Sequence, residues 1–333
     1  MAIDVRWGAR TDPGRVRELN EDSWLASPPL FAVADGVGGH AAGEVASGIA
    51  VTGIGRLAGS RAVEATSVLG AVRQVNGEIR ERAATVSSDR GMGSTVVGLA
   101  LSWYGQNDTM LVFNVGDSRA FRLSAGDLVQ VSRDHSLVDE LLRSGQITPE
   151  EALVHPCRSV ITRALGAADQ VDVDSWHIEA RVGDRFLLCS DGLTNEVGFE
   201  DLHRVLSDVP DPDEAAGVLV SLALDHGGRD NVTAVVVDVA AVSAVAGAGQ
   251  EQALATVTSP VGDAAELLPP TKPLPATGPS SFGPGAGEPA TPDVRATVQP
   301  RTLASPPQPR SRLPHDERAT NPVLPIDGTA PWS

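Results

Sequence analysis

The sequence contains very little lysine and cysteine. Lys272 is the one lysine among 26 lysine and arginine residues, so the chain before it has only guanidinium groups with which to recognise phosphate. The two cysteines, Cys157 and Cys189, show no CxxC spacing. This pattern indicates neither a disulfide framework nor a zinc cage, and it is consistent with a reducing compartment such as the cytoplasm.

Basic clusters and long apolar runs are also scarce. The formal net charge is -17, which argues against nucleic acid and anionic membranes as partners. The N-terminus, MAIDVRWGARTDPG, lacks the apolar core of a signal peptide. The one membrane-like stretch, residues 232–247, is interrupted by Asp238 and Ser243, and its first half is typical of a β-branched strand. We therefore expect a cytoplasmic protein that does not enter the membrane.

Composition changes sharply near residue 245. Of the 24 prolines, 17 lie beyond this point, in a Pro/Ala/Thr-rich segment with almost no aromatic residue. Such a mixture buries too little apolar surface to offset the entropy of ordering it, so we expect residues 246–333 to form a disordered tail. This tail has 8 acidic and 6 basic residues, so nearly all of the net charge belongs to residues 1–242, which we expect to form one acidic domain.

Strand and helix patterns alternate in blocks along this domain. Strands are predicted at residues 3–9, 23–26, 30–34, 94–103, 109–115, 120–123, 128–131, 171–178, 185–188 and 232–239, and helices at 41–59, 61–86, 199–206 and 212–225, with short helices starting at Ser136 and Thr148. Hairpin turns are predicted at Asn107-Asp108 and Ala125-Gly126. Blocks of this kind favour an α+β fold with antiparallel sheets covered by helices.

Aspartates stand where several apolar runs end. The stretch LFAVADGVGGH, residues 30–40, is an apolar run that stops at Asp35 and is followed by glycines, and the same arrangement recurs at Asp191 and Gly192. The full set is Asp22, Asp35, Asp117, Asp191 and Asp230. If the strand ends converge, five carboxylates need compensating cations, and Mg²⁺ or Mn²⁺ in an all-oxygen shell meets that need. Taken singly, each aspartate is equally consistent with a turn or a helix cap.

Two further residues suggest phosphate chemistry. Arg17 lies five residues before Asp22, from where its guanidinium could reach a phosphoryl group bound to the metals, although an exposed arginine is more often a solvated charge. His40 could donate a proton, but a histidine that opens a helix after Gly-Gly is as often a capping residue.

Eight short motifs together resemble the metal-dependent serine/threonine protein phosphatases of the type 2C, or PPM, family. In order they are Arg17-Glu-Leu-Asn-Glu-Asp22, Ala34-Asp-Gly-Val-Gly-Gly-His40, Gly93-Ser-Thr-Val-Val97, Val115-Gly-Asp-Ser-Arg119, Asp134-His-Ser136, Ile161-Thr-Arg-Ala-Leu-Gly166, Ser190-Asp-Gly-Leu-Thr194 and Asp230-Asn-Val-Thr233. Any one motif is weak evidence, whereas eight in this order and spacing cover nearly all of residues 1–240. The resemblance implies a PP2C-like four-layer α-β-β-α sandwich, in which two antiparallel sheets are flanked by helices.

The resemblance also implies a centre of two Mn²⁺ or Mg²⁺ ions with a weaker third site. Asp35 would bridge the two ions, Asp191 and Asp230 would complete the shell of the first, and the Gly36 carbonyl and a water held by Glu21 would serve the second. Further roles are implied for four residues: Asp117 would help to bind the third ion, Arg17 would bind phosphate, and Asp22 and Asn231 would support the ligands without touching an ion.

One position departs from many eukaryotic members. Those members have a histidine directly after the Asp-Gly, where it is proposed to protonate the leaving group, and this chain has Val37. Bacterial members commonly read Asp-Gly-x-Gly-Gly-His, as here, so His40 or a metal-bound water takes this role. Residues 131–166 fall where bacterial members carry a flap beside the active site.

Three functions are compatible with these features. The favoured one is an enzyme: a bacterial protein phosphatase, expected as a monomer, that hydrolyses phosphoserine and phosphothreonine in proteins and opposes Ser/Thr kinases. The alternative is a pseudophosphatase that binds phosphoproteins without turnover, which the complete set of aspartates disfavours. Cys157 and Arg163 also satisfy the C-x5-R spacing of cysteine-dependent phosphatases, but the β-branched residues between them favour extended backbone over a phosphate-binding loop.

Overall fold

Two antiparallel sheets form the centre of the fold. The computed structural model describes residues 3–37 and 42–242. One sheet has the strand order β1 (Ile3–Asp12), β11 (Val232–Val242), β10 (Arg185–Cys189), β7 (Arg119–Ser124) and β8 (Asp127–Gln130). The other has the order β2 (Asp22–Ser27), β3 (Leu30–Val37), β5 (Val96–Tyr104), β6 (Asn107–Val115) and β9 (Asp174–Glu179), and the short β4 (Gly93–Ser94) also pairs with β3. Every pairing is antiparallel.

The inner faces of the two sheets form a shared apolar core. Phe31 and Leu99 from one sheet pack in the same cluster as Phe186 and Val235 from the other, and all four side chains are fully buried. Along β3, Phe31 and Val33 face this shared core. They alternate with Leu30, Ala32 and Ala34 on the opposite face, as the two-residue period of a strand requires. The strands are therefore buried on both faces, which explains their nearly continuous apolar sequences.

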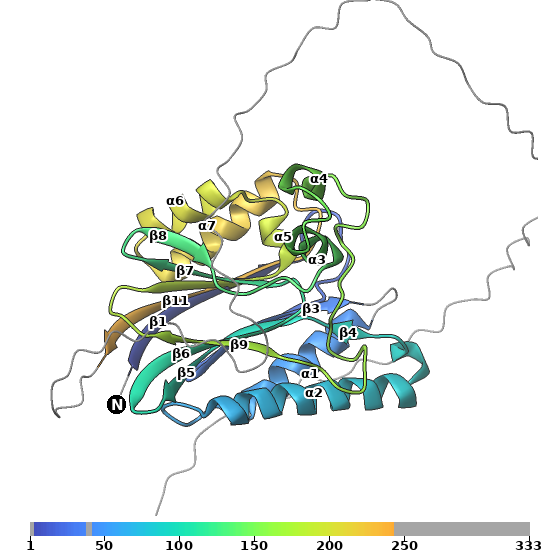
Figure 1. Cartoon of the computed structure of the whole chain (residues 1–333), viewed down its shortest axis with the longest axis horizontal. Helices are drawn as coiled ribbons and strands as arrows, with labels where there is room; N and C mark the ends of the chain where they lie inside the picture. The colour runs from blue at the N-terminus through green and yellow to red at the C-terminus, as the bar shows by residue number, and fades with distance from the viewer. Residues whose placement is uncertain (1–2, 38–41, 243–333) are drawn as a thin grey trace, which may run out of the picture. The chain divides into compact units, whose positions relative to one another are not determined.

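Helices cover both outer faces. The helices α1 (Gly43–Gly55) and α2 (Ala65–Thr85) pack on the β3 and β5 side, and α6 (Phe199–Asp208) and α7 (Pro212–Asp225) pack on the β10 and β11 side (Figure 1). The predicted four-layer α-β-β-α sandwich is thus confirmed. No helix in residues 3–37 or 42–242 combines the length and apolar character of a transmembrane span.

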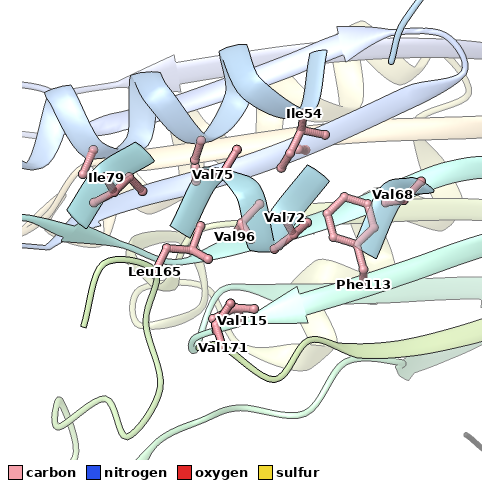
Figure 2. Packing of buried hydrophobic residues seen from close by; sticks show 14 of the residues in the cluster. Ile54, Val68, Val72, Val75, Ile79, Val96, Phe113, Val115, Leu165 and Val171 are labelled. Carbon is pink, nitrogen blue, oxygen red and sulfur yellow. The ribbon is translucent and has the colours of Figure 1, made fainter. Parts of the chain in front are cut away.

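The long helix α2 shows how a covering helix is anchored. Its residues Val68, Val72, Val75 and Ile79 recur at helical spacing and face the sheet, where Phe113 meets them (Figure 2). The ring of Phe113 occupies the space above Gly98, since a Cβ on that glycine would lie 2.0 Å from the ring.

Residues 131–166 form an excursion with two short helices, α3 (Leu137–Arg143) and α4 (Pro149–Leu153). Thr148 and Glu151 form a complete capping box at the start of α4. The base of the excursion is closed by a bridge between Ser136 and Ile161, and Leu165 anchors its end in the α2 core (Figure 2). The predicted short helices are confirmed, whereas the role of the excursion as a flap stays a prediction.

Some local predictions were wrong or incomplete. The β5–β6 hairpin turns at Gly105-Gln106 rather than at Asn107-Asp108, whereas the turn at Ala125-Gly126 is confirmed. The four-residue helix α5 (Asp191–Thr194) was not predicted. His40 and the predicted tail at 246–333 lie outside the described residues.

Candidate metal and phosphate site

Two aspartates face each other at the end of the β2–β3 pair. Asp22 and Asp35 are directly opposite in the register, so their side chains project to the same face. The Asp22 Oδ2 atom accepts hydrogen bonds from Ser190 Oγ at 2.7 Å and from Thr233 Oγ1 at 2.6 Å. Ser190 directly follows β10 and Thr233 lies in β11, so both hydroxyls come from the other sheet. Its Oδ1 is buried without a hydrogen-bond partner. Like charges directly opposite in a sheet repel, so this pair is costly unless a cation or a proton compensates it.

The end of β3 lies against the start of α1. A Cβ on Gly36 would lie 2.2 Å from the Gly43 carbonyl oxygen, so no residue with a side chain fits there without displacing the helix. The Glu21 carboxylate lies at the same point, because a Cβ on Gly43 would be 2.4 Å from its Oε1 and 3.0 Å from the Gly36 carbonyl oxygen. The Gly36 carbonyl and the Glu21 carboxylate, both predicted to serve one ion, are thus brought together.

Asp191 and Asp230 arrive from different segments. Asp191 is the first residue of α5, directly after β10, and it accepts a hydrogen bond from Asn195 Nδ2 at 3.0 Å. Asp230 precedes β11. The two segments touch at Gly192, where a Cβ would lie 2.0 Å from the Asn231 carbonyl oxygen and 3.4 Å from the Asp230 Cβ.

Asn231 joins this region to the chain around Glu21. Its side-chain oxygen accepts the backbone N–H of Glu21 at 2.8 Å, and its Nδ2 donates to the carbonyls of Pro13 and Leu19 at 2.9 and 2.8 Å. It therefore fixes the β1–β2 loop against β11 without presenting a free oxygen. Its role as a support for metal ligands stays a prediction.

Asp117 is held at the end of β6 by its neighbours. The Ser118 hydroxyl bonds that of Thr95 at 2.7 Å, and the N–H of Gly116 donates to His135 Nδ1 at 3.0 Å. The Asp117 side chain is 8% exposed. Its pKa is raised to about 7 by burial and by the negative charge of Asp191.

Burial and mutual repulsion disturb the whole group of carboxyls. The pKa of Asp22 is raised to about 7 by burial and by repulsion from Asp191, against the two hydroxyl hydrogen bonds that lower it. Burial, followed by repulsion from Asp22, raises the pKa of Asp35 well above its usual range. Burial also raises the pKa of Asp191, with Asp230 as the next cause, and that of Glu21. Burial and repulsion favour the protonated carboxyls, and the positive charges of Arg119 and Arg17 offset this effect only in part.

The donor set fits hard divalent cations. All candidate groups are oxygens, the Asp22 Oδ1 has no partner, and no described residue donates a hydrogen bond to the side-chain oxygens of Asp35. Within the described ranges no three His, Cys, Asp or Glu side chains are already gathered into a metal-binding group. Any ion held here would therefore need carbonyl oxygens and waters besides carboxylates to complete its shell.

Arg17 supplies the positive charge at the mouth of the cluster. Its Nη2 donates to Asp230 Oδ2 at 2.8 Å, and the side chain is half exposed. Among the contacts of the described residues this is its one hydrogen bond, so its other N–H groups are available to an anion. The structure thus brings Arg17 to the aspartates, as predicted.

An ion pair that the sequence did not indicate braces the Asp230 loop. The Glu196 carboxylate accepts the backbone N–H of Arg229 at 3.2 Å and its Nε and Nη2 at 2.8 and 2.9 Å, and the Glu196 carbonyl accepts His226 Nδ1–H at 2.8 Å. The Glu196 side chain is 3% exposed. Glu196 follows α5, and Arg229 precedes Asp230, so this contact ties together the segments that carry Asp191 and Asp230.

The C-x5-R spacing does not form a phosphate-binding loop. The Arg163 guanidinium bonds Asp174 at 2.6 Å and the Asp172 carbonyl at 3.2 Å. Residues 156–159 form turns, and Ile161 then forms a β-bridge with Ser136. Arg163 is thus committed to Asp174, and the cysteine mechanism has no support in this geometry.

Comparison with known proteins gives one consistent family. A family model described as Protein phosphatase 2C matches residues 15–222. The serine/threonine protein phosphatase PstP of Mycobacterium tuberculosis is 40% identical over 244 residues, which are 72% of this chain and 46% of that protein. The serine/threonine phosphatase stp of Listeria monocytogenes is 38% identical over 69% of this chain and 94% of its own length. The chain thus spans about half of the mycobacterial relative.

Solved structures show the same similarity. The crystal structure of the M. tuberculosis serine/threonine phosphatase PstP/Ppp superposes with a TM-score of 0.65 at 41% identity, covering 71% of this chain and 99% of that one. The catalytic domain of PstP in complex with two manganese ions gives a TM-score of 0.63 at 39% identity, with 71% and 99% covered.

Proposed function

Because the chain belongs to the protein phosphatase 2C family, we propose that it is a metal-dependent phosphatase that hydrolyses phosphoserine and phosphothreonine in proteins and opposes a Ser/Thr kinase. The observation that carries this proposal is the convergence of Asp22, Asp35, Asp117, Asp191 and Asp230 with Arg17 on one end of the sandwich. The manganese in the PstP complex supports Mn²⁺ as the ion.

The residues divide the work between cation binding and phosphate binding. Asp35 would bridge two ions, with Asp191 and Asp230 on the first and the Gly36 carbonyl and a Glu21-held water on the second, and Asp117 would bind a weaker third. Bound there, the ions would supply Lewis acidity and lower the pKa of an attacking water. Asp22 and Asn231 support this set, the first by bonding Ser190 and Thr233 and the second by fixing the Glu21 backbone.

Arg17 would bind the equatorial oxygens of the phosphoryl group. Its bond to Asp230 orients the guanidinium plane toward the aspartates, and the remaining N–H groups can then donate to phosphate. A positive charge placed there stabilises the negative charge that phosphoryl transfer spreads over these oxygens. A role for His40 in protonating the leaving group stays a prediction.

A phosphopeptide assay tests the proposal directly. Purified protein with Mn²⁺ is expected to release phosphate from a phosphothreonine peptide and from p-nitrophenyl phosphate, and EDTA or Asp191→Ala is expected to abolish both reactions. Retained turnover in the Asp191 variant would contradict the metal assignment. Binding of the peptide by wild type without any turnover would instead establish the pseudophosphatase, which the complete ligand set and the named relatives do not favour.

The Glu196–Arg229 brace gives a second prediction. Glu196→Gln is expected to weaken Mn²⁺ binding about tenfold, because partners that orient metal ligands are typically worth 10- to 100-fold in affinity. The measurement is a calorimetric Mn²⁺ titration, with the melting temperature in EDTA recorded beside it to separate metal binding from folding.

Two further variants make this test specific. Arg229→Ala removes the exposed side of the same ion pair and is expected to have a smaller effect in the same direction, and the double variant should be no worse than Glu196→Gln alone. Glu179→Gln, in an exposed pair with Arg181, is the matched control and should leave Mn²⁺ affinity unchanged. Additive losses in the double variant would show that Glu196 does not act through Arg229.

A further inference from the structure

The loop that carries Arg17 exposes two apolar side chains. Val16 is 67% exposed and Leu19 is 55% exposed, and they lie one residue before and two residues after Arg17. Isolated exposed apolar residues are ordinary on protein surfaces. These two differ because they border the arginine that we assign to phosphate binding.

The loop is held from several sides. The backbone N–H of Arg15 donates to the Gly228 carbonyl at 2.7 Å, and Asn231 Nδ2 holds the Leu19 carbonyl at 2.8 Å. Asn20 Nδ2 donates to Thr11 Oγ1 at 2.8 Å. The exposed apolar groups are therefore presented on a fixed backbone, so a binding partner need not order the loop itself.

The polar side chains of the loop are already engaged. Asp12 accepts the Gly14 N–H, Arg15 bonds the Leu224 carbonyl, and Arg17 bonds Asp230. Glu18 is exposed and negatively charged beside them. The charge of Arg15 is paired with Asp225, so a peptide that places its phosphate on Arg17 would meet the two apolar side chains and the exposed charge of Glu18, in a domain that is acidic as a whole.

We propose that Val16 and Leu19 form a docking surface for an apolar side chain that flanks the phosphorylated residue of the substrate. This inference rests on the proposed function and narrows its substrate class: phosphoserine or phosphothreonine segments with an aliphatic residue within a few positions are preferred, and segments with acidic flanks are disfavoured. The occupant is the substrate segment itself, because the two exposed residues flank the proposed phosphate-binding arginine in one loop and the negative charge of Glu18 opposes an acidic partner.

Three phosphothreonine peptides test the inference. They are identical except that the two residues on each side of the phosphothreonine are leucine, serine or glutamate. The readout is kcat/KM for each peptide divided by kcat/KM for p-nitrophenyl phosphate, which has no flanking residues. For wild type this ratio is expected to rank leucine above serine and serine above glutamate. Leu19→Ala is expected to lower the ratio about fivefold for the leucine peptide and to leave it unchanged for the serine peptide.

Val182→Ala is the matched control. Val182 is 65% exposed and lies just before Gly183, whose N–H donates to the Val239 carbonyl, at the opposite end of β10 and β11 from Asp191 and Asp230. This variant is expected to keep all ratios at the wild-type values.

The possible outcomes distinguish a failure of the proposed phosphatase function from a failure of the docking surface. Absence of p-nitrophenyl phosphate turnover in wild type contradicts the proposed function, whereas turnover with equal ratios for the three peptides overturns only the docking surface. A higher ratio in Leu19→Ala would mean that another part of the chain covers the surface. A later elution of Leu19→Glu than of wild type in size-exclusion chromatography would mean that a second copy covers it. Either result also overturns the inference.

Discussion

Asp35→Asn is expected to abolish Mn²⁺-dependent phosphatase activity and, in the same protein, to raise the melting temperature measured in EDTA. The activity should fall by about a thousandfold or more, because the metal centre supplies several kcal/mol of charge stabilisation and Asp35 is the proposed bridge between both ions. The measurement is phosphate release from a phosphothreonine peptide at saturating Mn²⁺.

The gain in stability follows from the same geometry. Asp35 lies directly opposite Asp22, and burial and four neighbouring carboxylates raise its pKa well above the usual range. Asparagine keeps the shape of the side chain and carries no charge, so it removes this repulsion. The melting temperature in EDTA should therefore rise, by roughly 2–4 °C for each kcal/mol of stability gained in a domain of this size.

Manganese should reverse the order of the melting temperatures of wild type and Asp35→Asn. Wild type gains about 2.7 kcal/mol at a Mn²⁺ concentration of about 100 times its dissociation constant, whereas Asp35→Asn gains much less. Wild type is therefore expected to melt below the variant in EDTA and above it in Mn²⁺. Asp127→Asn, at an exposed residue of β8, is the control and should change neither activity nor this order. A variant that melts below wild type in EDTA would contradict the assignment of Asp35 to a strained, metal-compensated cluster.

The sequence predicted this cluster only in part. That Asp35 and Asp191 end apolar runs is visible in the sequence, because a buried strand is apolar and its end is polar. That Asp22 lies opposite Asp35 depends on the register of β2 and β3, which the turn at Pro28-Pro29 and the packing of both strands set together. The sequence therefore supplied the residues of the site, and the pairing of strands supplied their arrangement.

The turn propensity of Asn107 and Asp108 predicted the β5–β6 turn at the wrong place, because the register of the two strands decides its position. Asn107 and Asp108 are strong turn formers, yet they pair with Tyr104 and Trp103 within the β5–β6 hairpin, and the turn falls on Gly105, which has a φ of 62°. The glycine accepts this backbone conformation without strain, which lets the two strands pair as far as Tyr104 and Asn107.

Contacts between distant short segments leave no periodic signal. Glu196 and Arg229 are 33 residues apart, and the helix α5 beside Glu196 has four residues, too few to show a helical pattern. The exposed Arg229 reads as a solvated charge, and the burial of Glu196 becomes visible only once the loop before β11 lies on it.

Without metal, the stability of the domain is expected to fall steeply as the pH rises from about 4 to 7. The carboxyls of Asp22 and Asp117 have a pKa of about 7 in the folded protein and 3.8 as their ordinary value. Below pH 3.8 these groups are protonated in both the folded and the unfolded chain. Above it the unfolded chain ionises first, while the folded chain keeps its protons until about pH 7, so the free energy of unfolding decreases throughout this window.

The size of this loss follows from the shift in pKa. A difference of about 3 pKa units corresponds to on the order of 4 kcal/mol per carboxyl, a large fraction of the stability of a typical domain. Other groups act in the opposite sense at lower pH. Although burial acts to raise it, hydrogen bonds from His135 and Arg163 hold the pKa of Asp174 at about 2, so that group adds stability as the pH rises from 2 to 4. The metal-free protein should therefore be most stable near pH 4.

Urea denaturation in EDTA and in saturating Mn²⁺, between pH 4.5 and 8, measures this dependence. In EDTA the unfolding midpoint should decline with pH, and Asp22→Asn or Asp117→Asn should each make the decline shallower. In Mn²⁺ the decline should disappear or reverse, because deprotonated carboxylates bind the ion and the ion then favours the folded state. A midpoint in EDTA that stays constant or rises from pH 4.5 to 7 would show that some charge other than a divalent ion already compensates these aspartates. The convergence of five carboxylates would then be no argument for a metal centre.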